Sequence, residues 1–400
     1  MAAPGTFCPR LTALEIASGV PVGAVPATAP PVAMRDVRAA LEAAIRPALL
    51  RPPCAVAFSG GRDSTAMLAV AARLAAREGL APPVALTARF PAAPATDESA
   101  WQERAVAAVG LEAWERLTLR AEDVEGLAPR AQDALRRHGL LYPPNLGLFL
   151  ALLEHAGGGS LITGLGGDEL LGAWRHRAAA DVLAGRRPLG SETPRALVRA
   201  LVPRPLLRAR AARAPTRHGV PRSRWLAPPA ARAHARSLAA ELASEPHAWS
   251  SRVRWKARRR RLALTRESFE RLACDTRTLI VHPLLDPRAV DALARSGGRL
   301  GFGDRSATLR ALFGDLLPRE LLERPGKAAF GDVFWGPATR EFARRLLEDG
   351  EPAVPALVDR RGLAESWTLA RPPGVSLLLL QASWLLATPD DLGVTAYACP

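Results

Sequence analysis

The stretch that decides the fold reads SGGRDST, from Ser59 to Thr65. Before it, Cys54 to Phe58 is a short apolar run typical of a buried parallel strand, and after it Thr65 to Arg77 has helical spacing. A strand, a Gly-rich turn and a helix together point backbone N–H groups and the positive end of a helix dipole at an anion. The GxxxxGK[ST] loop is excluded, because no lysine follows. We therefore predict a different kind of phosphate-binding turn.

The residues of this turn supply the rest of the expected phosphate site. The two glycines let the backbone approach a ligand closely, and the serines add hydroxyl donors. An aspartate beside a phosphate needs a cation between the two, so we assign Asp63 to Mg²⁺. The candidate binding residues of the first turn are Ser59, Gly60, Gly61, Asp63, Ser64 and Thr65.

Strands and helices are expected to alternate through the first half of the chain. After the first turn, further strands are expected at Val84 to Phe90, Trp114 to Leu119 and Ser160 to Thr163, with helices at Asp97 to Val109, Val124 to Arg137 and Leu146 to His155. This alternation predicts an α/β fold with a doubly wound parallel sheet, which binds ligands at the carboxyl ends of its strands. The remainder is expected to be mostly helical.

Composition divides the chain into four expected parts. These are a loosely ordered arm at 1–34, a nucleotide-binding core at 35–180, an Arg/Pro-rich insertion at 181–251 and a helical part at 252–400. The arm lacks the features of a signal peptide, and the apolar run from Val375 to Ala387 is too short to cross a bilayer, so it is expected to be a buried helix. Four widely spaced cysteines favour a reducing, cytoplasmic setting over a disulfide scaffold.

The formal net charge of +15 does not identify a partner. The basic residues are nearly all arginine, with Lys256 and Lys327 as the only lysines, and a GC-rich genome would produce the same bias. Two arginine-rich stretches, Arg204 to Arg224 and Lys256 to Arg261, have two interpretations: a docking surface for an acidic peptide, a carrier or RNA, or a solvated surface in an arginine-biased proteome.

A second Gly-rich turn, TGLGGDELLGAW from Thr163 to Trp174, follows the expected fourth strand. Its candidate binding residues are Gly164, Gly166, Gly167, Asp168 and Glu169. The glycines let the chain turn, and Asp168 would be a second Mg²⁺ ligand facing Asp63, since two carboxylates plus phosphate oxygens suit octahedral Mg²⁺. Taken alone, Asp168 and Glu169 could simply cap the next helix.

Both turns resemble motifs of known enzymes. SGGRDST resembles the PP-loop of ATP pyrophosphatases, which cut ATP between the α and β phosphates, and TGLGGDELLGAW resembles the GxGxDE(L/I)xGG segment of the asparagine synthetase family. His282 to Asp286 is similar to the family's P-F-L-D segment, and Gly303 to Phe330 to its closing stretch. The resemblance covers roughly residues 35 to 390 and implies an adenine nucleotide alpha hydrolase-like fold.

The resemblance implies an ATP-dependent, AMP-forming carbon–nitrogen ligase with ATP and Mg²⁺ as cofactors. A small-molecule or peptide carboxylate would attack the α-phosphate, release pyrophosphate and then form an amide with ammonia or an amine. Asp63, Asp168 and Lys327 are the implied catalytic residues, and in the family that lysine faces the reaction centre. Arg310 would either clamp a phosphate or fix a helix, and Asp97-Glu98 is either the family's acidic pair or a helix cap.

The chain also departs from the family pattern. Glutamine-dependent asparagine synthetases begin with Met-Cys on a glutaminase domain, whereas this sequence begins Met-Ala-Ala-Pro, so we expect the amine from free ammonia, a partner glutaminase or the substrate itself. Leu279 and Val281 replace a Glu-x-Arg, and RPGK replaces RxK. These changes put aspartate as substrate in question. With them, the chain is more similar to relatives that form other amides, such as lasso-peptide macrolactam synthetases and β-lactam synthetases.

Two rival functions remain open at this point. A PP-loop enzyme that modifies tRNA would fit the basic charge, although TGLGGDELLG and the absence of paired cysteines argue against it, so a nucleic acid partner is not expected. A non-catalytic nucleotide-binding partner subunit would fit the two turns, but intact Asp63, Asp168 and Lys327 argue against such decay. A membrane partner is not expected either.

Overall fold

The fold is built on one five-stranded sheet in which every neighbouring pair of strands is parallel. A computed structural model describes residues 10–26, 34–172, 174, 176–186, 202–203, 205–206, 208–209, 223–324, 326, 328 and 330–388. The strands are β1 (Cys54–Ala57), β2 (Val84–Arg89), β3 (Trp114–Thr118), β4 (Ser160–Ile162) and β5 (Leu279–Val281). Their order across the sheet is β3-β2-β1-β4-β5. The order reverses between β1 and β4, which places the ligand crevice of such a sheet beside these two strands.

Both faces of the sheet are covered by helices, as the near-continuous apolar strands require. Side chains alternate along a strand, so Val56 packs into one core cluster with α2 (Val37–Leu49), α3 (Arg62–Glu78) and α15 (Pro287–Ser296). Its neighbour Ala55 packs into another with α7 (Leu146–His155) and α14 (Arg260–Asp275). The predicted doubly wound α/β fold is confirmed.

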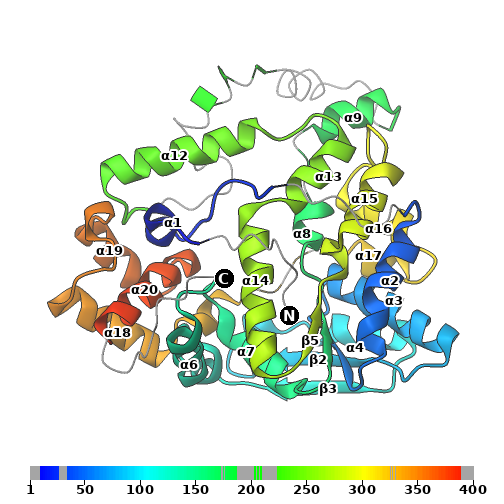
Figure 1. Ribbon diagram of the computed structural model, residues 1–400, viewed down its shortest axis with the longest axis horizontal. Coiled ribbons are helices and arrows are strands. Elements are labelled where there is room, and N and C mark those ends of the chain that lie inside the picture. Colours follow the sequence, from blue (N-terminus) through cyan, green and yellow to red (C-terminus); the bar gives the residue numbers. More distant parts are fainter. Residues whose placement is uncertain are drawn as a thin grey trace.

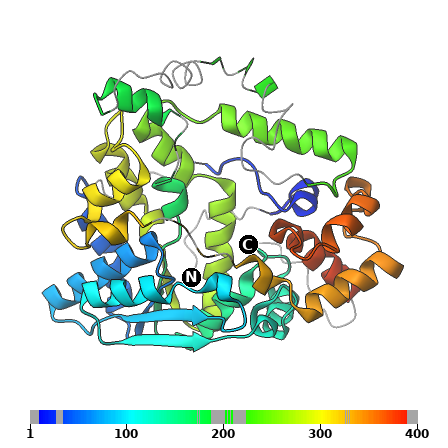
Figure 2. The same cartoon turned by 180° about the vertical axis from the view of Figure 1, so that it is seen from behind.

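The remaining elements surround this core (Figures 1 and 2). Among the described residues, the other helices of the first half are α1 (Ala13–Ser18), η1 (Pro94–Thr96), α4 (Ser99–Val109), α5 (Ala121–Val124), α6 (Pro129–His138), α8 (Gly167–Leu170) and α9 (Arg177–Leu183). Those described in the second half are α12 (Pro228–Ala243), α13 (Trp249–Ala257), η3 (Pro283–Leu285), α16 (Arg305–Phe313), α17 (Arg319–Leu322), η4 (Gly331–Phe334), α18 (Pro337–Asp349), η5 (Pro355–Leu357), α19 (Arg360–Trp367), η6 (Gly374–Ser376) and α20 (Leu377–Ala387).

The C-terminal helices form a separate apolar cluster at the opposite end of the molecule from α2 and α3 (Figure 1). α20 is buried in this cluster, as its apolar run predicted, and Trp225 is fully buried there. None of the helices among the described residues is both long and apolar enough to cross a membrane.

Part of the predicted loosely ordered arm is instead a helix. Residues 13–18 form α1, which begins with a capping box between Thr12 and Glu15. The indole N–H of Trp225 donates to the carbonyl of Ala17 over 2.7 Å, and Arg260 pairs with Glu15 at 2.7 Å. Tertiary partners more than 200 positions away along the chain therefore stabilise a helix that local composition did not predict.

Other boundaries differ from the sequence-based expectations. β5 was missed, because Leu279–Val281 is too short an apolar run to be told from a helix segment. The helix expected from Val124 to Arg137 begins only at Pro129, as α6, because the preceding helix α5 already ends at Val124. Within the expected insertion, residues 228–243 form α12. Most of the arginine-rich stretch 204–224 lies outside the described residues.

Candidate active site

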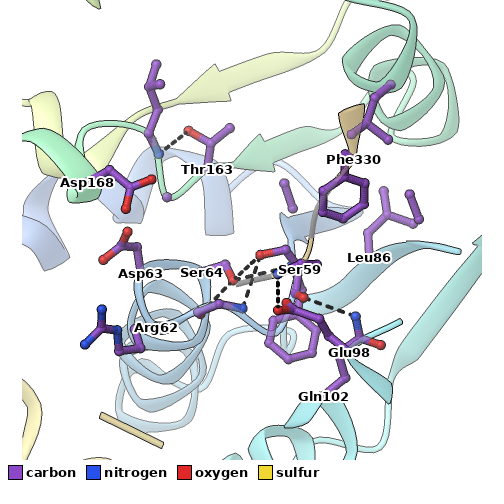
Figure 3. Close-up of a pocket in the computed structure, with 18 of the residues that line it drawn as sticks. Ser59, Arg62, Asp63, Ser64, Leu86, Glu98, Gln102, Thr163, Asp168 and Phe330 are labelled. Atoms are coloured by element: carbon purple, nitrogen blue, oxygen red, sulfur yellow. Dashed lines mark hydrogen bonds between the residues drawn. The ribbon is translucent and has the colours of Figure 1, made fainter. Parts of the chain in front are cut away.

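The first turn leaves the carboxyl end of β1 and enters α3. Gly60 has φ 79°, and a Cβ there would lie 2.7 Å from Cγ of Gln102, so only glycine fits. The hydroxyls of Ser59 and Ser64 lie 3.2 Å apart, and the Ser59 hydroxyl accepts the N–H of Gly61 over 3.2 Å. The two predicted hydroxyl donors are thus together on one side of the turn (Figure 3). Thr65 is buried one turn into α3.

The second turn leaves β4 and packs directly against the first. A Cβ on Gly164 would lie 3.1 Å from the backbone nitrogen of Ser64, and a Cβ on Gly167 would lie 2.2 Å from Cγ of Asp63. Gly166 has φ 96° and lies against Leu285. The missing side chains therefore let the two turns touch, which the glycine pattern alone did not reveal.

The two aspartates face each other across this contact (Figure 3). Arg305, the first residue of α16, joins them: its Nη2 lies 2.5 Å from Oδ2 of Asp63, and its Nη1 lies 2.5 Å from Oδ1 of Asp168. Burial lowers the pKa of Arg305, but attraction to Asp63 and hydrogen bonds to both carboxylates outweigh burial, so the net pKa is raised. One cation thus holds both acids, although they lie about a hundred positions apart in the chain.

Arg62 adds a second guanidinium to this end of the site. Its Nη1 lies 3.3 Å from the hydroxyl of Ser306. Burial lowers the pKa of Arg62, and repulsion from Arg305 lowers it further. Two arginines and two aspartates therefore crowd the end of the two turns, an arrangement suited to polyanions with a counter-cation.

The second turn is held from behind by two buried side chains. Arg252 of α13 donates from Nη1 to the carbonyl of Leu170 over 2.6 Å, and from Nη2 to those of Glu169 and Gly172 over 3.1 and 3.0 Å. These contacts satisfy carbonyls at the end of the one-turn helix α8. Nδ1 of His282 lies 2.6 Å from the hydroxyl of Thr163. Burial, and then Arg266, lower the pKa of His282 to about 3, so this imidazole is neutral.

A cavity of about 320 Å³ opens between the strand ends and these turns. Its charged end is formed by the two turns with Arg62 and Arg305, and Glu98, Gln102 and Arg324 line the cavity farther from Asp168, beside Ser59. Its apolar wall comes from the sheet, α7 and the residue before η4, and includes Leu86, Ala88, Leu148, Phe149, Leu152 and Phe330. Figure 3 shows Phe330 and Leu86 on the side away from Asp168. The cavity therefore has one charged end and one apolar end.

The family model for asparagine synthase matches residues 36–385. The chain belongs to the asparagine synthase family. This is a family of ATP-dependent ligases, and the predicted relationship is confirmed. None of the curated proteins compared matches the sequence.

Of the other site residues expected from the asparagine synthase pattern, some line the cavity and others do not. Asp97 accepts the backbone N–H of Ser99, the first residue of α4, over 2.9 Å, whereas Glu98 lines the cavity. A role of the acidic pair in binding stays a prediction. Arg310 pairs with Glu323 and is not among the described residues that line the cavity. Glu169 does not line it either. Lys327 lies outside the described residues, but Gly326 and Ala328 line the cavity.

Two hard carboxylate oxygens at the charged end fit the chemistry of Mg²⁺, which protein sites often bind through one or two carboxylates while phosphates and water complete the octahedron. The described residues contain no cluster of three or more His, Cys, Asp or Glu side chains, so the protein alone does not form a full metal cage there. The carboxylates of Asp63 and Asp168 therefore fit a metal ion that is bound together with a phosphate, whose oxygens would complete its coordination.

Some site residues carry no assigned role in the sequence-based prediction. Arg305, Arg324 and Gln102 contact the turns only after the chain has folded back over long distances. Arg305 and Arg324 lie within the stretch that resembles the family's closing segment, and this was the available signal. In a chain with 54 Lys and Arg residues, an arginine by itself does not stand out.

Proposed function

We propose that this protein is an AMP-forming amide ligase of the asparagine synthetase type. A carboxylate oxygen of the substrate attacks the α-phosphorus of ATP, the bond to the β-phosphate breaks, and pyrophosphate leaves. The nitrogen of ammonia or an amine then attacks the acyl carbon, AMP leaves, and the nitrogen loses a proton to form the amide. The observation that carries this proposal is the meeting of Asp63 and Asp168, from two separate glycine turns, at the charged end of the cavity.

Each part of the site has a task in this reaction. The first turn would bind the β and γ phosphates through its backbone N–H groups and the hydroxyls of Ser59 and Ser64. Asp63 and Asp168 would hold Mg²⁺, which neutralises charge on the departing pyrophosphate. Arg62 and Arg305 add fixed positive charge at the same end. Lys327, by resemblance, would stabilise charge in the transition states.

The apolar wall of the cavity is suited to contact the adenine ring of ATP or an apolar part of the acyl substrate. It is less suited to contact the carboxylate of a free amino acid. Val281, at the carboxyl end of β5, pairs in register with Ile162 of β4, next to the second turn. An aliphatic side chain thus occupies the edge where the family pattern has arginine. This supports an amide product other than asparagine, such as a macrolactam or a β-lactam, although an asparagine product is the alternative that the same assay tests.

The test is pyrophosphate release from ATP and Mg²⁺ across a panel of aspartate, small β-amino acids and acidic peptides, with and without ammonia. Release that depends on a carboxylate, followed by an amide product identified by mass spectrometry, is the expected result. Turnover with aspartate and ammonia alone identifies asparagine formation, and turnover with a peptide alone identifies a cyclase. No release with any carboxylate favours a non-catalytic subunit, and salt-sensitive tRNA binding with tRNA adenylation favours the RNA-modifying alternative.

A further inference from the structure

Two carbonyl groups of the first turn are hydrogen-bonded by side chains from outside it. The side-chain amide Nε2 of Gln102, on α4, donates to the carbonyl of Ser59 over 3.1 Å. Arg324, after α17, donates from Nη1 to the carbonyl of Gly60 over 2.6 Å. These are two consecutive peptide units at the centre of the turn. Figure 3 shows Gln102 and Glu98 beside Ser59, on the side of the turn away from Asp168.

The direction of these carbonyls determines the direction of the neighbouring N–H groups. In a trans peptide the C=O and the N–H of one unit point in opposite directions. Holding the carbonyls of Ser59 and Gly60 therefore also fixes the N–H groups of Gly60 and Gly61. The N–H of Gly61 is also held by the Ser59 hydroxyl, to which it donates over 3.2 Å, so the two carbonyl contacts act together with this bond. Glycine backbone rotates freely, so without such contacts the turn has several accessible orientations.

Arg324 is itself held by Glu98. The two form a salt bridge whose side chains are 5% and 6% exposed, and Oε1 of Glu98 also accepts the backbone N–H of Ala328 over 2.9 Å. The guanidinium of Arg324 also lies 5.2 Å from the ring centre of Trp101. A buried ion pair is costly to desolvate unless hydrogen bonds satisfy it, and here both partners also bind backbone. Glu98 thus ties the first turn to the segment at Ala328.

We propose that Arg324, Glu98 and Gln102 are positioning residues for the phosphate turn, preorganising its N–H groups for the β and γ phosphates. They act through the backbone of Ser59 and Gly60. This inference rests on the proposed binding of ATP phosphates at the first turn. It assigns to the buried Glu98–Arg324 pair a functional task beyond stability.

The test compares the binding of ATP, pyrophosphate and AMP by the full chain and by the variants Arg324→Gln, Glu98→Gln and Gln102→Leu. Because hydrogen bonds that involve a charged group are worth most, Arg324→Gln should weaken ATP and pyrophosphate binding by about tenfold or more, and AMP binding by less than about threefold. Glu98→Gln keeps an oxygen acceptor and should have a smaller effect of the same kind. A purely structural role would lower thermal stability without changing the ratio of ATP to AMP affinity.

The chain offers a matched control in Glu241→Gln. Glu241 and Arg259 form another buried salt bridge, with side chains 13% and 3% exposed, and Glu241 also accepts a backbone N–H, that of Gly23, over 2.7 Å. Neither residue lines the cavity. This variant should lose stability while its ATP to AMP ratio stays at the wild-type value. An equal change of that ratio in Glu241→Gln and Arg324→Gln overturns the inference.

Amide hydrogen exchange separates this inference from the proposed function. Exchange in residues 59–62 should be faster in Arg324→Gln than in wild type, and unchanged in Glu241→Gln, whether or not the protein turns over ATP. A wild type that binds no ATP overturns the proposed function, while unchanged exchange in Arg324→Gln overturns the positioning role.

Discussion

The two glycine turns each bring one aspartate to the same edge of the sheet, but they are stabilised differently. The first leads into α3, a helix of 17 residues whose own hydrogen bonds fix the direction of Asp63. The second leads into α8, which has only four residues and depends on Arg252 to satisfy its carbonyls. A long helix positions a side chain by local structure, whereas a single turn needs a tertiary partner. Asp168 should therefore be more sensitive than Asp63 to changes elsewhere in the molecule.

The largest expected effect tests whether the two turns have equal chemical tasks. Asp63→Asn and Asp168→Asn should each lower the rate of pyrophosphate release by about a thousandfold, because each removes a charge from the proposed metal site. Steady-state kinetics with saturating ATP and Mg²⁺ measure this. Asp359→Asn, at the cap of α19, is the control and should retain wild-type turnover. If either site variant keeps a tenth of the activity, its aspartate is not a required ligand.

The next effect tests the dependence of the second turn on its tertiary partner. Arg252→Met should lower the free energy of unfolding by about 3 kcal/mol, since it leaves one buried and two partly buried carbonyls, and the buried Glu245, without their guanidinium. Denaturant unfolding measures this. Arg254→Met on the same helix removes a guanidinium that is 44% exposed and should cost less than about 1 kcal/mol. Equal losses in the two variants would show that α8 does not depend on Arg252.

A smaller effect concerns the contact between the turns. Gly167→Ala introduces a Cβ 2.2 Å from Cγ of Asp63, so Asp63 must move. Turnover should fall by about tenfold to a hundredfold even though alanine has the higher helix propensity. Gly374→Ala, where a Cβ meets nothing within 4 Å, is the control. Wild-type activity in Gly167→Ala would mean that the turns need not touch.

The smallest expected effect is a pH dependence of the free energy of unfolding that comes from His282, which bonds to Thr163 at the start of the second turn. Its pKa in the folded protein is about 3, below 6.5 in the unfolded chain, so the unfolded state takes up the proton first as pH falls. The contribution of His282 to the free energy of unfolding is therefore complete above pH 6.5 and is lost as pH falls towards 3. Between pH 7.5 and 5.0 this loss amounts to about 2 kcal/mol.

Denaturant unfolding at the two pH values measures it. His282→Asn, which can still bond to Thr163, should lose about 2 kcal/mol less than wild type over this range. An identical pH dependence in both proteins would exclude His282 as the titrating group.

The sequence allowed the sheet, its first four strands and both turns to be predicted, because each rests on a local pattern of apolar runs and glycines. What it did not predict depends on contacts between distant residues. α1 is stabilised through Trp225 and Arg260, and the bridging of the aspartates depends on Arg305, more than 130 positions from either one. Arg310 was expected either to clamp a phosphate or to fix a helix, because it lies in the stretch that resembles the family's closing segment, and its partner in the structure is Glu323.

The bridging by Arg305 has a consequence for how the protein is made. Synthesis proceeds from the N-terminus, so Asp63 and Asp168 both leave the ribosome long before Arg305 does. Until then, a partly folded nascent chain that brought the turns together would place two negative charges opposite each other with Arg62 near them but without the guanidinium of Arg305, which bonds to both. Arg305 can pair with both aspartates only when α16 packs against the two turns. The packing of α16 is therefore a late step of folding that is favoured electrostatically.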